Sequence, residues 1–409
     1  MTGVCETVPV PSPPAAAVAG VPLERLARVD LGAVRHNVRT LRARLVRPDG
    51  TAPALMAVVK ADAYGHGAVP VARAALAAGA ERLGVAHVAE ALELRAAGIT
   101  APVLAWLHTR DTPFVAALEQ DVALGVSSAA ELEAVAAAAR ATGRRAVVHV
   151  KADTGLGRNG CLPEALPALA ALAAALQADG LVDVEGLFSH LSVADELDRA
   201  EETDAQAAAF ASAADVLAAA GVPTRVRHLA NTPAALTRPD LHHDMVRVGL
   251  GLYGLSPFPG RAPEEFGLRP AMSLRTTLAQ VKRVGPGQGV SYGFRFRTDA
   301  DTVLGLVPLG YADGVPRVAE DAPVAVGGRR VRAVGRIAMD QFLVDLGPDA
   351  QETVGTPVEL FGPDSGIPAD AWAEAAGTIN YELVTRISPR VPRVHVDAQA
   401  AGDAEEDRA

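Results

Sequence analysis

The 409-residue sequence lacks most features of a secreted, membrane-bound or nucleic-acid-binding protein. It has two cysteines, Cys5 and Cys161, so no disulfide framework can be read from it, which fits a reducing cytoplasm. Its net charge of −10 argues against nucleic acid and anionic membrane surfaces as partners. No apolar run reaches spanning length, and the start has no basic signal-peptide region. Aromatic residues make up only 4%, so the core is expected to be mostly Ala, Val and Leu.

The length and the 49% of apolar residues indicate two domains with a large core. The Pro/Ala-rich residues 1–22 and the acidic residues 397–409 are predicted to be disordered tails. A proline-rich stretch over 257–270 is typical of a linker. We therefore expect one domain over 23–265 and a second over 266–396.

Short apolar runs alternate with alanine-rich helical stretches from residue 54 onward. Strands are predicted at Ala54–Lys60, Arg82–His87, Pro102–Leu107, Asp121–Val126, Ala146–Lys151, Val184–Ser189, Arg225–Leu229 and Met245–Gly249. Helices are predicted at Val69–Ala78, Glu90–Ala97, Thr112–Glu119, Ala129–Ala141, Pro163–Ala178, Glu201–Ala220 and Thr232–Leu236. This alternation favours an α/β fold with a closed, TIM-like (β/α)8 barrel, and a doubly wound open sheet is the alternative.

The helical pattern stops after residue 266. The runs SLRTTLAQVKRV, DTVLGLVPLG, APVAVGG, RRVRAVG and PVELFG are short, β-rich and broken by glycine or proline, which is typical of a mainly β domain. Before the barrel, a helix is predicted between Arg25 and Leu45. The segment RLARVD, near 25–30, reads as an extra strand that joins the second domain.

The segment AVVKADAYGHG, over 57–67, is the most informative about chemistry. Its apolar run ends at Lys60, and burial there would lower the pKa of the amine and make it nucleophilic. Such a lysine can form a Schiff base with an aldehyde cofactor, although a strand-end lysine can also simply reach solvent. Gly65 and Gly67 allow the backbone to approach a phosphate before the next helix begins.

Further polar side chains lie where predicted strands end, the position at which barrel enzymes carry catalytic groups. They are Lys151, His190, His228, Asn231 and Arg247. Each alone could be a structural hydrogen-bond or ion-pair partner, but five strand ends on one rim indicate a cationic site with one amine nucleophile. No carboxylate pair suits glycoside hydrolysis, and no His/Cys spacing suits zinc, so no metal is expected.

Two segments after the last two barrel strands suit a phosphate, because barrels commonly hold one there. Thr232 offers a hydroxyl at a helix start, and 249–251 offers backbone amides, including those of Gly249 and Leu250. In the second domain, glycine-flanked turns present Tyr292 and Tyr311. A turn tyrosine is usually just a half-buried ring, so position alone favours a structural role over a catalytic one for Tyr292.

The motifs as a set resemble the alanine racemase family. They are, in family order, AVVKADAYGHG, KADTGLGRNG, SHLSVAD, HLANTPA, RVGLGLYGLSP, SYG, GYADG, GRIAMDQ and RVPR. The resemblance covers residues 25 to about 396. It implies an isomerase that interconverts L- and D-alanine with pyridoxal 5'-phosphate and supplies D-alanine for the cell wall. It also implies a cytoplasmic homodimer with composite active sites.

The resemblance implies a two-base mechanism, because racemisation removes a proton from one face of Cα and returns it to the other. Lys60 would carry the cofactor and act on one face, and Tyr292, supplied by the partner subunit, would act on the other. Arg247 would face the pyridine nitrogen and, since it keeps its proton, leave that nitrogen largely unprotonated. His190 would connect Tyr292 to Arg247.

The remaining roles implied by the resemblance concern binding and support. Further cofactor contacts would come from Tyr64, Arg158, His190, Asn231, Thr232, Gly249 and Leu250. The substrate would be held by Arg158 and Met339. Supporting positions would be Lys151, which is carbamylated in many family members, His228, Tyr311 and Asp340.

One position departs from the family pattern. Where the family often reads ISYRVPR, this chain reads ISPRVPR, so Pro389 replaces a tyrosine that touches the phosphate and narrows the entrance. Proline has neither a hydroxyl nor an amide hydrogen, so that contact is lost. A racemase for serine or a larger amino acid is therefore an alternative. A non-catalytic pyridoxal-phosphate carrier generally lacks the second domain, and the related decarboxylases usually need carboxylate and cysteine motifs that we do not find.

Overall fold

The computed structural model describes residues 24–397 and divides them into two units. We call residues 30–271 the barrel unit, and residues 24–29 with 272–395 the β unit. The sequence predicts the division between the two domains at residues 265/266. In the structure, the chain leaves the barrel unit and enters the β unit at residues 271/272. The tails predicted to be disordered lie outside the described residues, except for Asp397.

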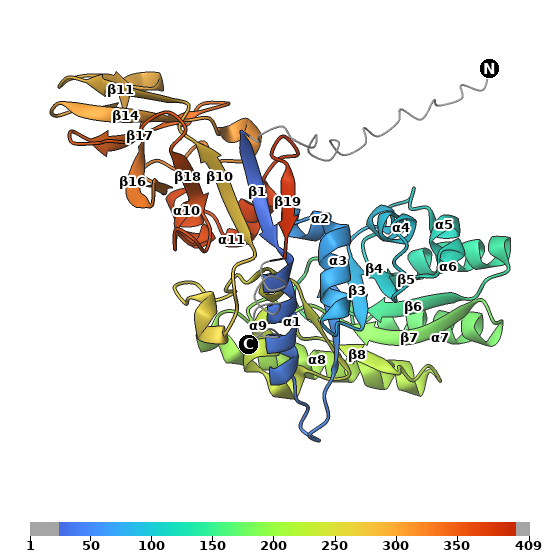
Figure 1. The fold of residues 1–409 in the computed structure, drawn as a ribbon. Helices are drawn as coiled ribbons and strands as arrows, with labels where there is room; N and C mark the ends of the chain where they lie inside the picture. Colours follow the sequence, from blue (N-terminus) through green and yellow to red (C-terminus); the bar gives the residue numbers. More distant parts are fainter. Residues whose placement is uncertain (1–23, 398–409) are drawn as a thin grey trace, which may run out of the picture. The chain divides into compact units, whose positions relative to one another are not determined.

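The barrel unit contains eight parallel strands in the order β8-β7-β6-β5-β4-β3-β2-β9 (Figure 1). Their bounds are β2 (Ala54–Val58), β3 (Arg82–Val85), β4 (Val103–Ala105), β5 (Val122–Val126), β6 (Ala146–Lys151), β7 (Val182–Phe188), β8 (Val226–His228) and β9 (Met245–Val248). β9 pairs with β2, which leaves β8 and β9 as the two end strands of this order, and closure of the barrel depends on the seam between them. At the remaining seam, two backbone amides bridge β8 and β9: Asp244 donates to Arg227 at 3.0 Å and Arg247 donates to Ala230 at 2.9 Å. The prediction of a (β/α)8 barrel is confirmed.

Helices follow the strands and cover the outside of the barrel (Figure 1). They are α1 (Leu31–Arg44), α2 (Lys60–Gly65), α3 (Ala68–Ala77), α4 (Val88–Ala96), α5 (Phe114–Glu119), α6 (Ala129–Thr142), α7 (Leu166–Ala178), α8 (Ala200–Ala219) and α9 (Thr232–Thr237). Local capping fixes several starts: the Asp30 carboxylate accepts the Gly32 amide at 2.8 Å, and the Ser128 hydroxyl accepts the Glu131 amide at 3.2 Å.

Glycines inside the strands make room for large side chains in the barrel interior. A Cβ at Gly84 would lie 2.7 Å from the Trp106 ring, and one at Gly125 would lie 2.9 Å from the Phe188 ring. Buried Met56, Leu104 and Met245 pack around the same interior. Small and large residues therefore alternate around the barrel, so that its centre is a packed core.

The β unit is built on a nine-stranded sheet with the order β11-β14-β17-β16-β15-β18-β10-β1-β19. Its strands are β1 (Arg25–Asp30), β10 (Met272–Thr277), β11 (Gln280–Val284), β14 (Thr302–Val307), β15 (Pro323–Val326), β16 (Arg329–Val334), β17 (Phe342–Gly347), β18 (Pro357–Phe361) and β19 (Arg393–Val396). A small second sheet pairs β12 (Gly289–Val290) with β13 (Phe296–Arg297), and two helices are α10 (Ala369–Ala375) and α11 (Asn380–Thr385). The prediction of a mainly β domain is confirmed. The predicted β-rich runs do not include β12, β13, β17 or β19, and no helix was predicted where α10 and α11 lie.

Candidate active site

Lys60 follows β2 and begins a left-handed turn. The four residues after it have φ between 52° and 54° with ψ between 40° and 50°, which is one left-handed helical turn. This conformation costs non-glycine residues roughly 1–2 kcal/mol each. Such strain persists only where surrounding contacts impose it, and it is concentrated at functional sites.

Contacts from other elements hold this turn in place. The Ala61 amide donates to the Glu90 carboxylate of α4 at 2.6 Å, and the Asp62 carboxylate accepts the Ala68 amide at the start of α3 at 2.6 Å. The Tyr253 ring packs 4.9 Å from that of Tyr64, and its hydroxyl donates to the Val58 carbonyl at 2.8 Å. The turn therefore fixes the directions of the Lys60 and Tyr64 side chains.

The Lys60 amine lies in a positively charged environment. Burial lowers its pKa, and the positive charge of Arg158 lowers it further. Glu90 opposes this change, whereas Arg247 adds to it. At a given pH, a larger fraction of the Lys60 amine is therefore neutral than in an ordinary lysine, and the neutral form is the one that acts as a nucleophile or base.

Tyr64, Thr232 and Gly249 meet at the ends of β2, β8 and β9. The Gly249 amide donates to the Thr232 hydroxyl at 3.2 Å. A Cβ at position 249 would lie only 2.4 Å from the Tyr64 hydroxyl oxygen, so only glycine permits this approach. Burial raises the pKa of the Tyr64 phenol to about 12, which keeps it a hydrogen-bond donor.

Two further residues of the predicted phosphate site lie beside this group. The Asn231 side chain caps α9 by accepting the Ala234 amide at 3.3 Å, which gives it a structural role in the described chain. Leu250 is buried and begins the short 3-10 helix Leu250–Tyr253 directly after Gly249.

Arg247 is anchored by backbone carbonyls in the barrel interior. Its guanidinium donates to the carbonyls of Ser189 at 2.6 Å and Leu229 at 3.0 Å, and to that of His228. Burial lowers its pKa to about 9, so it remains charged at neutral pH. His190 Nδ1 lies 3.5 Å from it, and burial together with the charge of Arg247 holds the pKa of His190 well below its ordinary value.

Lys151 ends β6 and opens the loop that carries Arg158. Its amine donates to the Asn159 side chain and lies 5.5 Å from the centre of the Phe188 ring. Burial, with the charges of Arg247 and Arg158, lowers the pKa of Lys151 to about 8. The Arg158 side chain is exposed, in a loop whose turn is held by the Asp153 carboxylate accepting the Gly155 amide at 2.9 Å.

The predicted site residues of the β unit are exposed. Tyr292 is 68% exposed, Met339 52% and Tyr311 38%, and Phe294 beside Tyr292 is 58% exposed. Tyr292 and Phe294 lie in the same short 3-10 helix, so two large exposed rings occur within one turn. The Tyr292 turn is held by the Ser291 hydroxyl, which donates to the Arg336 carbonyl at 2.6 Å.

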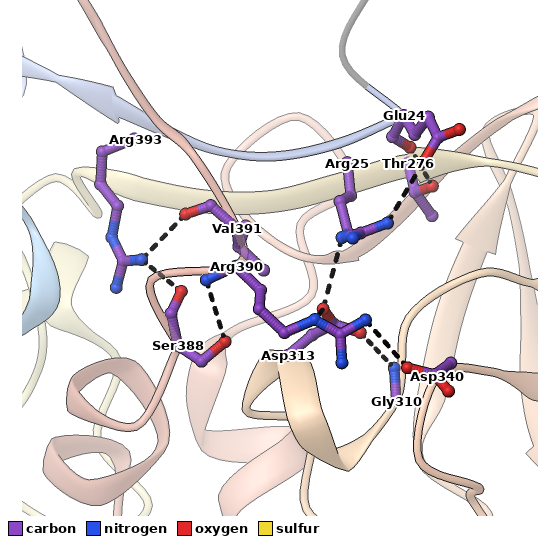
Figure 2. A network of polar contacts seen from close by, with 10 residues as sticks. All are labelled: Glu24, Arg25, Thr276, Gly310, Asp313, Asp340, Ser388, Arg390, Val391 and Arg393. Carbon is purple, nitrogen blue, oxygen red and sulfur yellow. Dashed lines mark hydrogen bonds and ion pairs between the residues drawn. The ribbon is translucent and has the colours of Figure 1, made fainter. Parts of the chain in front are cut away.

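A buried carboxylate ties together the segments that carry Tyr311, Asp340 and Pro389. Figure 2 shows Arg25 and Arg390 converging on Asp313, with nitrogen–oxygen distances of 3.3 and 3.5 Å. Arg390 also donates to Asp340 at 2.8 Å, and the Ser388 amide donates to the Asp313 carbonyl at 3.0 Å. The residues before and after Pro389 are therefore both fixed by polar contacts.

The donor set of the barrel unit fits pyridoxal phosphate. Lys60 supplies an amine for an aldehyde, whereas Tyr64, Thr232 and the Gly249 amide supply donors of the kind that bind a phosphate. Arg247 supplies a group that stays protonated at neutral pH, of the kind expected beside the ring nitrogen. Within the described residues, no three His, Cys, Asp or Glu side chains are grouped as a metal site would need. The helices of residues 24–397 include none that is both long and apolar enough for a membrane span.

Sequence reasoning missed the left-handed turn and one interior residue, His149. The turn contains no glycine among its four left-handed residues, so no local signal marks it. His149 stands in the middle of a strand and not at its end. A polar residue in the apolar run AVVHVK was the signal available.

Two family profiles match this chain. The one described as "Alanine racemase, N-terminal domain" matches residues 29–257, and the one described as "Alanine racemase, C-terminal domain" matches residues 271–395. Alanine racemase of Thermobifida fusca (strain YX) is 52% identical over 91% of this chain and 98% of the relative. Alanine racemase of Streptomyces coelicolor is 50% identical over 92% of this chain and 96% of the relative.

Solved structures give the same result. Alanine racemase from D-cycloserine-producing Streptomyces lavendulae has a TM-score of 0.89 at 51% identity, covering 92% of this chain and 98% of that one. Alanine racemase from Bacillus anthracis with bound L-Ala-P has a TM-score of 0.83 at 36% identity, covering 93% and 97%.

Proposed function

This chain belongs to the alanine racemase family, and from that premise we propose that it interconverts L-alanine and D-alanine with pyridoxal 5'-phosphate. The observation that carries the proposal is the strained turn at Lys60, which aims a lysine of lowered pKa and the Tyr64 phenol at one end of the barrel. When bound, pyridoxal phosphate supplies an electron sink that makes the α-hydrogen of an amino acid acidic enough to transfer.

The barrel unit supplies the groups for binding and for one proton transfer. Tyr64, Thr232 and the Gly249 amide would hold the phosphate through hydrogen bonds to its charged oxygens. Lys60 would hold the cofactor and exchange a proton with one face of Cα. Its lowered pKa suits that role because a base works best near the operating pH.

Tyr292 of the partner subunit would exchange a proton with the opposite face. Its 68% exposure, with that of Phe294 beside it, supports a partner-supplied role, since a subunit surface would cover both rings. Each positioned acid or base is worth roughly 10²- to 10⁴-fold in rate. We therefore propose an obligate homodimer with composite active sites.

Arg247 would limit the cofactor chemistry because its guanidinium does not readily give up a proton. Its guanidinium is a donor only, it is held by three carbonyls, and it stays charged at neutral pH. It would therefore leave the ring nitrogen without a full proton and limit the stability of a carbanion. This favours returning the proton to Cα over side reactions such as transamination.

Arg158 and the backbone at Met339 would bind the substrate carboxylate, and Tyr311 would line the entrance. Lys151 would orient the Arg158 side chain. Its pKa of about 8 leaves a substantial neutral fraction, as carbamylation by CO2 requires. The product would serve cell-wall synthesis in the cytoplasm.

Pro389 supports a second candidate function, racemisation of serine or a larger amino acid. The segments on both sides of it are held by Arg390 and Ser388, so the backbone is not free to fill the place of a tyrosine ring (Figure 2). Comparing initial rates on L-alanine, L-serine and longer L-amino acids would separate strict from broad specificity.

The proposed function is tested by D-alanine formation from L-alanine with the purified protein and pyridoxal phosphate. Lys60→Ala is expected to abolish it. Lys282→Ala, which removes an exposed lysine from β11 of the β unit, is expected to leave it unchanged and is the matched control. No D-alanine from the wild-type protein with bound cofactor would overturn the proposal.

A further inference from the structure

Behind Arg247, a continuous chain of polar groups crosses the barrel interior. Arg247 Nη1 lies 3.2 Å from His228 Nδ1, and His228 Nε2 lies 2.9 Å from His149 Nδ1. His149 Nε2 lies 2.9 Å from a Glu185 carboxylate oxygen. Arg82 then pairs with both Glu185 oxygens at 2.6 and 2.7 Å. The five residues come from β9, β8, β6, β7 and β3, so the chain joins most of the barrel.

The backbone makes room for this chain. A Cβ at Gly186 would lie 2.1 Å from His149 Nδ1, so a glycine is required opposite the ring. The pairing of β6 with β7 shifts register between Val148 and His149, a bulge that re-aims the His149 side chain. The Phe188 ring stacks on His228 at 5.0 Å and 6°. These features hold two imidazoles edge to face in an apolar surrounding.

The residues at the two ends of this hydrogen-bonded series, Arg247 and Glu185, determine which ring nitrogen carries the hydrogen in His228 and in His149. Arg247 can only donate, so His228 Nδ1 must accept and its Nε2 must carry the hydrogen. His228 Nε2 then donates to His149 Nδ1, which leaves the hydrogen of His149 on Nε2. That hydrogen meets the Glu185 carboxylate, which can only accept. The assignment made from Arg247 and the one made from Glu185 are therefore the same.

The charges around the chain support this assignment. Burial lowers the pKa of His149 and holds that of His228 well below its ordinary value, so both rings are neutral. Hydrogen bonds from Arg82 and His149 hold the pKa of Glu185 far below its usual range, so the carboxylate stays charged. Glu185 and Arg82 also line a cavity of about 220 Å³, away from the Lys60 turn.

We propose that Arg82, Glu185 and His149 are positioning residues that fix the Nε2–H tautomer of His228 and, through it, the orientation of Arg247. Without the Glu185 carboxylate, His149 could place its hydrogen on Nδ1, and His228 would then turn an N–H toward the guanidinium. Two donors facing each other in a buried site would push Arg247 from its place. The catalytic consequence rests on the proposed racemase function, whereas the tautomer assignment does not.

The tautomers can be measured directly on the full-length protein labelled with ¹⁵N-histidine, with and without pyridoxal phosphate. Signals are assigned by comparison with His149→Gln and His228→Gln. The proposal expects a hydrogen on Nε2 and a bare Nδ1 for both rings in the wild-type protein. A hydrogen on Nδ1 of either ring, or a doubly protonated ring, would overturn it.

Rates on L-alanine test the consequence. Glu185→Leu, which removes the acceptor of the His149 hydrogen, is expected to lower kcat about tenfold, the scale for loss of a hydrogen-bond partner behind a functional histidine, with KM changed less than twofold. Asp183→Asn is the matched control, because Asp183 lies two residues earlier on β7 and pairs with Arg225 at 2.7 Å without touching a histidine. It should leave kcat within about twofold and the histidine signals in place, since it is outside the chain of hydrogen bonds.

A second pair of variants tests the proposal if Glu185→Leu does not fold. His149→Gln keeps one donor and one acceptor and is expected to retain most activity, whereas His149→Leu is expected to lose about tenfold in kcat. Equal losses in both, or an equal loss in Asp183→Asn, would overturn the proposal. If the wild-type protein forms no D-alanine at all, the proposed function fails, and the histidine signals still decide the tautomer assignment.

Discussion

Replacing Ala61 by glycine should make the barrel unit more stable. Ala61 has φ 52° and ψ 50°, a left-handed conformation that costs a residue with a Cβ roughly 1–2 kcal/mol and costs glycine almost nothing. Glycine loses about 0.5–1 kcal/mol more backbone entropy on folding, which offsets part of the gain. The net expectation is a stabilisation of about 1 kcal/mol. The Ala61 side chain is exposed and its amide bond to Glu90 is kept, so no other contact is lost.

Ala137→Gly is the matched control for this substitution. Ala137 is exposed in the middle of α6, where the same exchange should destabilise by about 1 kcal/mol. The opposite signs are measured as shifts of the urea midpoint at constant m, each a few tenths of a molar. If Ala61→Gly lowers the midpoint as Ala137→Gly does, the left-handed turn is not strained and the reasoning fails.

Three further predictions follow from contacts in the two units. Gly249→Ala should weaken pyridoxal-phosphate affinity about 10- to 100-fold, because its Cβ would meet the Tyr64 hydroxyl oxygen at 2.4 Å; unchanged affinity in a titration would refute the proposed phosphate site. Pro389→Tyr should lower the ratio of serine to alanine racemisation about tenfold, and an unchanged ratio of kcat/KM values would show that this position does not control substrate size. Lys151 has its pKa lowered to about 8, so the unfolded chain binds more protons between pH 8 and 10, and the free energy of unfolding should rise with pH there. In bicarbonate-free buffer the slope should approach 1.4 kcal/mol per pH unit and disappear in Lys151→Met; an equal slope in both proteins would contradict the shift.

The fold was predictable where the sequence repeats a pattern. Each of the eight barrel strands lies within or close to its predicted range, because apolar runs bounded by helical segments are a strong periodic signal. The β unit was less predictable. Helices α10 and α11 are short and joined closely, and β17 is a six-residue strand that follows the irregular GRIAMDQ segment, so none of them has a distinct period of its own.

The sequence suggests candidate site residues at strand ends, whereas other features of the candidate site carry no such signal. Lys60, Lys151, His190 and Arg247 stand where a barrel places reactive groups, so topology alone singled them out. The left-handed turn could not be predicted, since Glu90 and Asp62 impose it through contacts with other elements. The same is true of His149, whose role depends on a bulge and on a glycine of the neighbouring strand.

The measurement that tests the two-base account most directly is exchange of the alanine α-hydrogen with solvent deuterium, started separately from each enantiomer. In Tyr292→Phe, the account predicts that exchange from L-alanine falls by roughly 10²- to 10⁴-fold, whereas exchange from D-alanine, which uses Lys60, persists without racemisation. Tyr381→Phe, which removes a hydroxyl from α11 of the same unit, should leave both directions unchanged. Full exchange from both enantiomers in Tyr292→Phe would contradict the account.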